Sequence, residues 1–164
     1  MKTPLLTIVL FAILLCSCET KPTKPVVSEV ENIETTTPIE VTYHASHEPK
    51  KATAPFSDAV QVGDLFFLSG QIGMDQTTRT LVEGGIEAET KQTLENIKAV
   101  LAHHGMDMSD VVKSLVVLDN IEDFAAFNAI YTTYLPQKPA RTTFAAEALA
   151  AGAKIEIEVI AVKR

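Results

Sequence analysis

The chain has 164 residues, 46% of them hydrophobic and 21% charged, which is typical of one globular domain with short appendages. Its formal net charge of −7 argues against a nucleic-acid partner, because phosphate binding depends on clustered Lys and Arg. The two cysteines, Cys16 and Cys18, both precede any foldable segment. This position excludes a disulfide framework, a cysteine-based metal site and a cysteine nucleophile within the domain.

Residues 1–17 have the pattern of a bacterial lipoprotein signal peptide. Lys2 is followed by an apolar run over residues 5–16, too short to span a membrane comfortably but suited to a signal peptide. The run ends in Leu15-Cys16-Ser17-Cys18, which resembles a lipobox. The resemblance implies cleavage before Cys18, acylation of Cys18 and a lipid-anchored location in the bacterial cell envelope, periplasmic or surface-facing. An ordinary secretory signal cleaved near Ser17 is the alternative.

Residues 18–49 indicate an extended tether. The stretch from Glu19 to Pro49 is rich in Pro and Thr and holds six Glu against two Lys, with few large apolar side chains. The dense apolar pattern of a folded domain starts near Lys50 and continues to Arg164.

Hydrophobic periodicity and turn residues place the secondary structure of residues 50–164. Strands are predicted at residues 59–63, 65–72, 78–83, 111–118, 141–146 and 154–162. A first helix is indicated by the helical spacing of Ile86, Thr90, Leu94, Ile97 and Leu101, with Gly105 as its C-terminal cap. A second helix is expected between its N-cap Asn120 and Pro136, with Phe124, Phe127, Tyr131 and Tyr134 along one side. The order β-β-(β)-α-β-α-β-β predicts one α+β domain.

Two strands are apolar on both faces, which predicts self-association. In residues 154–162, Ile160 and Val162 share a face with Glu156 and Glu158, and residues 111–118 are likewise apolar on both sides. Two helices cover only one face of a sheet, and each apolar side chain left on the other face gains about 1.5–3 kcal/mol on burial. A second copy of the chain covering that face is therefore expected.

Three residues are candidates for chemistry. Arg141 opens a strand after a Pro-containing loop, where its guanidinium can bind a carboxylate of a ligand or of the protein surface. Glu156 becomes partly desolvated if a partner covers its strand face, and it can then activate a water molecule; a solvent-facing Glu is the alternative. Gly70 interrupts an apolar strand, which indicates a bulge or a close approach of the backbone to a ligand.

The remaining candidates are assigned no site. His103 and His104 are adjacent at a helix end, point about 100° apart and receive a structural role. His44 and His47 lie in the tether. No spacing of carboxylates or histidines suggests a metal site, and no Gly-rich phosphate loop or serine-nucleophile motif is present.

Taken in order, six segments of residues 50–164 resemble the reactive-intermediate deaminase (RidA/YjgF) family. They are Ala54-Pro55-Phe56-Ser57 with Ala59-Val60, Leu68-Ser69-Gly70-Gln71-Ile72, Thr93-Leu94-Glu95-Asn96-Ile97, Asp123-Phe124-Ala125-Ala126-Phe127-Asn128, Pro139-Ala140-Arg141-Thr142, and residues 154–162. The resemblance implies a chorismate-mutase-like (YjgF-like) α+β domain with a mixed sheet, two helices on one face, and assembly as a homotrimer with ligand clefts between subunits.

The same resemblance implies hydrolytic deamination of reactive 2-imino acids to 2-keto acids and ammonia, without a cofactor. It implies that Arg141 binds the substrate carboxylate, that Glu156 handles the attacking water, and that Gly70 and Asn128 lie near the pocket. Two positions depart from the family pattern, since Phe56 replaces a pocket tyrosine and Thr143 replaces a frequent cysteine. Their side chains would shape substrate binding. The expected partners are a small imino acid, further copies of the chain, and the membrane through the lipid anchor.

A second hypothesis from another class is a non-catalytic trimer that binds a small metabolite in the same inter-subunit cleft. Export from the cytosol, together with Phe56 and Thr143, motivates it. A third, a structural trimer or holdase with an exposed apolar surface, has only the high apolar content in its favour.

Overall fold

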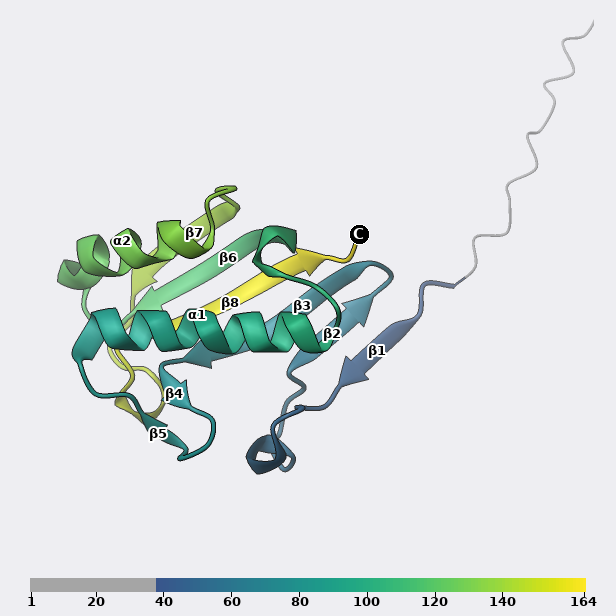
Figure 1. Cartoon of the computed structure of the whole chain (residues 1–164), viewed down its shortest axis with the longest axis horizontal. Coiled ribbons are helices and arrows are strands. Elements are labelled where there is room, and N and C mark those ends of the chain that lie inside the picture. The colour runs from purple at the N-terminus through teal and green to yellow at the C-terminus, as the bar shows by residue number, and fades with distance from the viewer. Residues whose placement is uncertain (1–37) are drawn as a thin grey trace, which may run out of the picture. The chain divides into compact units, whose positions relative to one another are not determined.

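A computed structural model describes residues 38–164 (Figure 1). The predicted signal peptide, Cys18 and most of the predicted tether lie outside the described residues. The fold is a six-stranded mixed sheet in the order β1-β2-β3-β8-β6-β7, with two α-helices on one face (Figure 1). The strands are β1 (Val41–His44), β2 (Ala59–Val62), β3 (Leu65–Ile72), β6 (Val111–Leu118), β7 (Ala140–Ala145) and β8 (Ile155–Val162). Neighbouring strands are antiparallel except β6 and β7, which run parallel.

The predicted α+β class, with a mixed sheet and two helices on one face, is confirmed. The helices are α1 (Gly85–His103) and α2 (Phe124–Tyr134). Strands β3 and β6 have the predicted bounds, β2 and β8 differ from prediction by one residue at one end, and β7 is shifted by one residue at both ends. The predicted strand at 78–83 is shorter: only β5 (Thr80–Leu81) forms, and it pairs with β4 (Met74–Asp75) in a small separate hairpin.

The folded part begins before residue 50. Strand β1 lies within the stretch predicted as tether, yet it pairs with β2 in antiparallel register from Val41↔Val62 to His44↔Ala59. Four residues, three of them β-branched or aromatic, are enough to extend an existing sheet edge, because the neighbouring strand supplies the hydrogen-bond partners. Composition alone gives no signal for so short an addition.

Local sequence explains where the helices end. Helix α1 stops in a Schellman arrangement, in which Gly105 has a φ of +73° and the Met106 N–H donates to the Leu101 carbonyl at 2.9 Å. Asn120 caps a 3-10 turn (Ile121–Asp123) through the Glu122 N–H, and α2 begins only after this turn, at Phe124. The predicted cap residue is thus correct, while the α-helix starts later than expected.

The hydrophobic core lies between the helices and one face of the sheet. Its largest fully buried side chains come from both helices and from β3, β6 and β8: Phe66, Phe127, Leu94, Ile97, Leu101, Leu118, Ile155 and Ile157. A buried polar pair crosses the core, since the Ser114 and Tyr131 hydroxyls lie 2.6 Å apart. Each satisfies the other, so burial of both hydroxyls costs little.

The other face of the sheet carries no helix (Figure 1), and every strand places apolar side chains on it, although β8 also places Glu156 and Glu158 there. The strand register aligns Tyr43 with Val60, Val60 with Phe67, and Phe67 with Ile160, so the side chains form a continuous surface. Phe67 is 41% exposed and Phe144, on β7, is 46% exposed. We call this apolar surface the open face. In a single chain the open face is exposed to solvent. The prediction of self-association rests on this exposure of apolar side chains.

All four histidines of the chain meet at the C-terminal end of α1. His103 stacks on His47 at 4.8 Å between ring centroids, and His104 packs against His44 at 4.5 Å and Phe66 at 5.3 Å. Burial, followed by the charge that His44 would carry, lowers the pKa of His104 to about 4. The structural role predicted for His103 and His104 therefore includes contacts with residues that were placed in the tether.

Candidate active site

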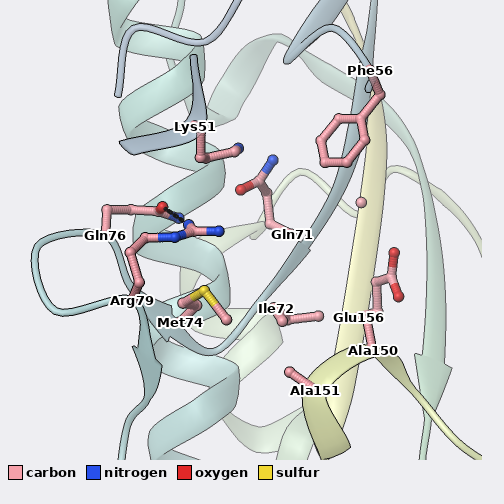
Figure 2. A pocket seen from close by; sticks show the side chains of 11 residues that line it. Lys51, Phe56, Gln71, Ile72, Met74, Gln76, Arg79, Ala150, Ala151 and Glu156 are labelled. Carbon is pink, nitrogen blue, oxygen red and sulfur yellow. Dashed lines mark hydrogen bonds between the residues drawn. The ribbon is translucent and has the colours of Figure 1, made fainter. Parts of the chain in front are cut away.

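A cavity of about 280 Å³ opens beside the bulged end of β3 (Figure 2). Its walls come from β3, β8, the β4–β5 hairpin and the loop that precedes β8. The lining residues are Lys51, Phe56, Gly70, Gln71, Ile72, Met74, Gln76, Arg79, Ala150, Ala151 and Glu156. Three residues proposed from sequence, Phe56, Gly70 and Glu156, thus lie around one cavity.

A β-bulge in β3 makes room for the carboxylate of Glu156. Leu68 pairs with Val159 and Gln71 with Ile157, so that Ser69 and Gly70 together face a single residue of β8. A Cβ atom on Gly70 would lie 2.0 Å from the Glu156 Oε1. The glycine predicted to mark a bulge is therefore required for a second reason, because any larger residue would displace the Glu156 side chain.

Glu156 projects from the open face of the sheet, since its neighbours Ile155 and Ile157 are fully buried on the helix side. Burial, followed by the negative charge of Glu158, raises the pKa of Glu156. Within residues 38–164 its carboxylate makes no hydrogen bond or ion pair with another side chain. A half-buried carboxylate with a raised pKa and free oxygens is suited to hold and deprotonate a water molecule.

The opposite wall of the cavity is polar and positively charged (Figure 2). Lys51 forms a buried ion pair with Asp58, with 2.6 Å between Nζ and Oδ1, so its charge is neutralised inside the protein. Arg79 donates from Nη1 to Oε1 of Gln76 at 2.6 Å. Gln71, buried between the two walls, donates its amide N–H to the Ser69 carbonyl at 3.1 Å.

Phe56 forms the aromatic rim of the cavity. It is 52% exposed, and the Lys51 Nζ lies 6.0 Å from its ring centroid. Its ring provides apolar contact area without a hydroxyl group.

Arg141 lies elsewhere in the chain, on the edge strand β7. Its guanidinium carbon is 4.6 Å from the ring centroid of Tyr131 and 5.3 Å from that of Phe127, and its Nη1 donates to Oδ1 of Asn128 at 2.9 Å. In the described part of the chain no carboxylate pairs with it. The Thr143 Oγ1, on the same strand face, is buried without a hydrogen-bond partner among residues 38–164. Aromatic faces and one neutral amide thus hold a guanidinium whose charge remains available.

The sequence-derived site residues therefore form two groups. Phe56, Gly70 and Glu156 make one, and Asn128, Arg141 and Thr143 make the other. Register pairs Val117 with Glu156 and Ser114 with Arg141, which separates the two Cα atoms by about 14 Å, from roughly 4.8 Å per strand and 3.3 Å per residue. The two side chains also lie on opposite faces of the sheet, because Arg141 packs under α2. One chain does not bring them together.

Sequence reasoning missed the positively charged wall. Lys51 is buried only through its pairing with Asp58, and Arg79 reaches the cavity only because the β4–β5 hairpin folds over it. Neither residue lies in a motif that signals a binding site. Gln71 lies in one of the segments that resemble the family, but its place in the sequence predicts no role for it.

No group of three or more His, Cys, Asp or Glu side chains that could hold a metal ion occurs among residues 38–164. The cavity presents one carboxylate, Glu156, which alone does not make a metal site. In the same residues, neither helix is long and apolar enough to cross a bilayer.

Comparison with known proteins agrees with this architecture. The family model described as Endoribonuclease L-PSP matches residues 45–163. Protein DfrA of Myxococcus xanthus is 44% identical over 122 residues, covering 73% of this chain and 92% of that protein. The 2-iminobutanoate/2-iminopropanoate deaminase of Mus musculus is 42% identical over 113 residues, covering 68% of this chain and 84% of that protein.

Solved structures give the same result. The crystal structure of the YjgF gene product of E. coli superposes with a TM-score of 0.69 at 31% identity, covering 75% of this chain and 99% of that one. RidA from a Psychrobacter species gives a TM-score of 0.65 at 36% identity, covering 76% of this chain and 97% of that one. With the family model matching more than half of its length, the chain belongs to the Endoribonuclease L-PSP (RidA/YjgF) family.

Proposed function

We propose that the protein hydrolyses reactive 2-imino acids, the tautomers of enamines, to 2-keto acids and ammonia. The observation that carries the proposal is the Glu156 carboxylate, which is half-buried, faces the cavity and has no side-chain partner among the described residues. Relatives named as 2-iminobutanoate/2-iminopropanoate deaminases, at 42–44% identity, support the same reaction class.

The reaction needs one water molecule and one group that moves a proton. Glu156 takes a proton from the water while the water oxygen attacks C2 of the imine, and it passes that proton to the imine nitrogen, which gives a tetrahedral carbinolamine. The same carboxylate then takes the proton of the carbinolamine hydroxyl and delivers it to the nitrogen. The C=O bond forms as the C–N bond breaks, and ammonia leaves with a keto acid as the other product. Burial favours this role, because a raised pKa brings Glu156 closer to the pH at which an acid–base group both accepts and donates.

The substrate carboxylate needs a cation in a fixed orientation, and Arg141 supplies it from a second copy of the chain. Within one chain Arg141 is about 14 Å from Glu156 on the other face of the sheet, from the strand spacings, so it cannot serve the same cavity. Joining the apolar open faces of several copies buries that surface and brings the edge of one copy to the cavity of the next. A closed ring repeats the same contact between successive copies, and the homotrimer is the assembly we infer.

The surroundings of Arg141 fit it for carboxylate binding. Three aromatic rings of α2 and the Asn128 amide fix the plane of the guanidinium without neutralising it. Two of its remaining N–H groups can form a bidentate contact with a carboxylate, which sets the imine carbon in position for attack. Imine hydrolysis is already fast in water, so orientation is the main contribution required.

The test uses residues 38–164 mixed with an amino-acid oxidase that produces imino acid, with semicarbazide as the trap. The wild type is expected to lower semicarbazone formation and to accelerate ammonia release, whereas Glu156→Gln and Arg141→Ala are expected to do neither. Arg141→Lys is the control that keeps the positive charge but lacks the planar guanidinium needed for a bidentate contact, and it should retain only part of the activity. Equal competition by Arg141→Ala and the wild type would contradict the proposal.

The second candidate function is metabolite binding without turnover. Phe56, which gives the cavity an aromatic rim without a hydroxyl group, is the observation in its favour. A thermal shift with a keto acid, combined with no ammonia release from any imine, would establish it.

Ribonuclease action, which the family model's description names, receives less support. The net charge of −7 disfavours binding to a polyanion. Of the residues that the structure describes, only two basic ones line the cavity, and one of them, Lys51, is paired with Asp58.

We also propose that a lipid on Cys18 anchors the domain to the cell envelope. The support is the Leu-Cys-Ser-Cys ending of the apolar run, which precedes the Pro- and Thr-rich stretch. Metabolic labelling with a fatty acid should mark the full-length protein and fail to mark Cys18→Ser.

A further inference from the structure

The cavity has a charged group that the hydrolysis described above does not use. Arg79 projects from the β4–β5 hairpin into the cavity, on the wall opposite Glu156 (Figure 2). In the proposed reaction, Glu156 acts at the imine and Arg141 of a second copy binds the α-carboxylate, so a monocarboxylic substrate needs no further charged group. The function of a further guanidinium at this wall therefore needs an explanation.

The hairpin holds Arg79 in a defined place. Oδ1 of Asp75 accepts hydrogen bonds from the Thr77 and Thr78 N–H groups at 2.7 and 2.9 Å, and the Arg79 N–H donates to the Asp75 carbonyl at 2.9 Å. This turn gives Arg79 a φ of +64°, a conformation that suits glycine better than a residue with a side chain. A long cationic side chain is thus present at a position where the backbone conformation favours glycine.

The charge of Arg79 is not neutralised by the described part of the protein. Its one side-chain partner there is the neutral Gln76, at 2.6 Å, and no carboxylate of residues 38–164 forms an ion pair with it. Lys51, the other cation of the same wall, is paired with Asp58. Arg79 is therefore the cation of this wall that can bind an anionic group of a ligand, and its further N–H donors suit a carboxylate.

The space between the two charged walls is mostly apolar, with the buried Gln71 as its polar side chain. Ile72, Met74 and Ala151 line it between Glu156 and Arg79. This arrangement suits a short aliphatic chain that carries a reacting centre at one end and a negative charge at the other.

Accepting the proposed deaminase function, we infer that Arg79 selects 2-imino acids with a second carboxylate, that is, 2-imino dicarboxylic acids of the kind formed by oxidation of acidic amino acids. The α-carboxylate lies on Arg141 of a second copy, the imine carbon lies at Glu156, and the side-chain carboxylate reaches Arg79. Arg79 acts here as a specificity-determining residue and takes no part in proton transfer. Because its side chain is exposed, salt weakens the selection.

The test compares kcat/KM for the imines of glutamate and norvaline, which have similar length and differ in the distal charge. The wild type is expected to prefer the dicarboxylic imine, and Arg79→Gly is expected to lower the preference ratio about tenfold. Glycine suits the positive φ, so the variant keeps the turn. Arg79→Glu should reverse the preference, while Lys91→Gln, which removes an exposed cation from α1, should leave the ratio as it is.

A binding measurement separates this inference from the deaminase proposal. Calorimetric titration of 2-oxoglutarate and of 2-oxopentanoate into the wild type and Arg79→Gly requires no turnover. Tighter binding of 2-oxoglutarate that depends on Arg79, with no ammonia release from any imine, would support the carboxylate site and refute the deaminase function. Ammonia release with an unchanged preference ratio in Arg79→Gly and Arg79→Glu would refute the selectivity and leave the deaminase function standing.

Discussion

Replacing Gly70 by alanine tests how Glu156 is positioned. The added Cβ would lie 2.0 Å from Oε1 of Glu156, and ordinary contact begins near 3.4 Å. The carboxylate must therefore retreat by about 1.4 Å, and a displacement of about 1 Å from a productive geometry costs roughly 10²-fold in rate. We expect kcat/KM for imine hydrolysis to fall by about that factor.

Folding should change much less than catalysis. Gly70 does not have a positive φ, so alanine is compatible with its backbone, and the atom it meets is the end of a flexible side chain. We expect the free energy of unfolding to change by less than about 1 kcal/mol in either direction. Thermal melting of Gly70→Ala beside the wild type checks this.

A double-mutant cycle identifies the cause of the rate loss. If Gly70→Ala acts through the Glu156 carboxylate, it should cost little when it is added to Glu156→Ala, which already lacks that group. Full additivity of the two substitutions, or a Gly70→Ala enzyme within threefold of the wild type, would refute the reasoning about the bulge.

Two further predictions concern stability and pH. Because burial raises the pKa of Glu156, the ionised form of this carboxyl destabilises the fold as pH rises through that pKa. Glu156→Gln should therefore raise Tm by a few degrees at neutral pH and lose this advantage near pH 4. The same variant should have no activity. The pH dependence of stability that His104 contributes has the opposite sign, since its pKa falls from 6.5 to about 4 on folding. As pH falls, the unfolded chain protonates this histidine at a higher pH than the folded chain does. The free energy of unfolding should therefore decline as pH falls from 6.5 towards 4 and level off below about pH 4. After allowance for the partial exposure of His104, the loss should be about 1–2 kcal/mol, and denaturant titrations should show it reduced in His104→Gln; an identical pH profile in that variant would contradict the assignment.

The fold was largely predictable because its signals are local. Strand β3 alternates exposed and buried side chains over its first four residues, and α1 ends at a glycine whose positive φ the sequence suggests. Strand β1 was missed because its stability comes from pairing with β2 rather than from its own four residues. The predicted strand at 78–83 is too long at both ends, because Thr78 and Arg79 belong to the turn that Asp75 organises and Val82 and Glu83 lead into α1.

The site was predictable only in part, and the reason is distance along the sheet. The bulge at Gly70 and the strand face of Glu156 both follow from residue patterns, since each depends on period-two alternation. Such patterns do not predict that β7 lies at the edge of the sheet, parallel to β6. This position of β7 separates Arg141 from Glu156. The position of Arg79 depends on how a hairpin folds back over the sheet, which is also a tertiary property.

Mixed assemblies test the central claim, that one site combines Glu156 of one copy with Arg141 of the next. Arg141→Ala and Glu156→Gln are each expected to be inactive alone. When the two are unfolded together in equal amounts and refolded, random assembly into closed rings gives about one quarter of the interfaces both functional residues. Ammonia release is expected to recover to about that fraction of the wild-type rate. No recovery, from mixtures shown to contain mixed trimers, would contradict a site shared between copies.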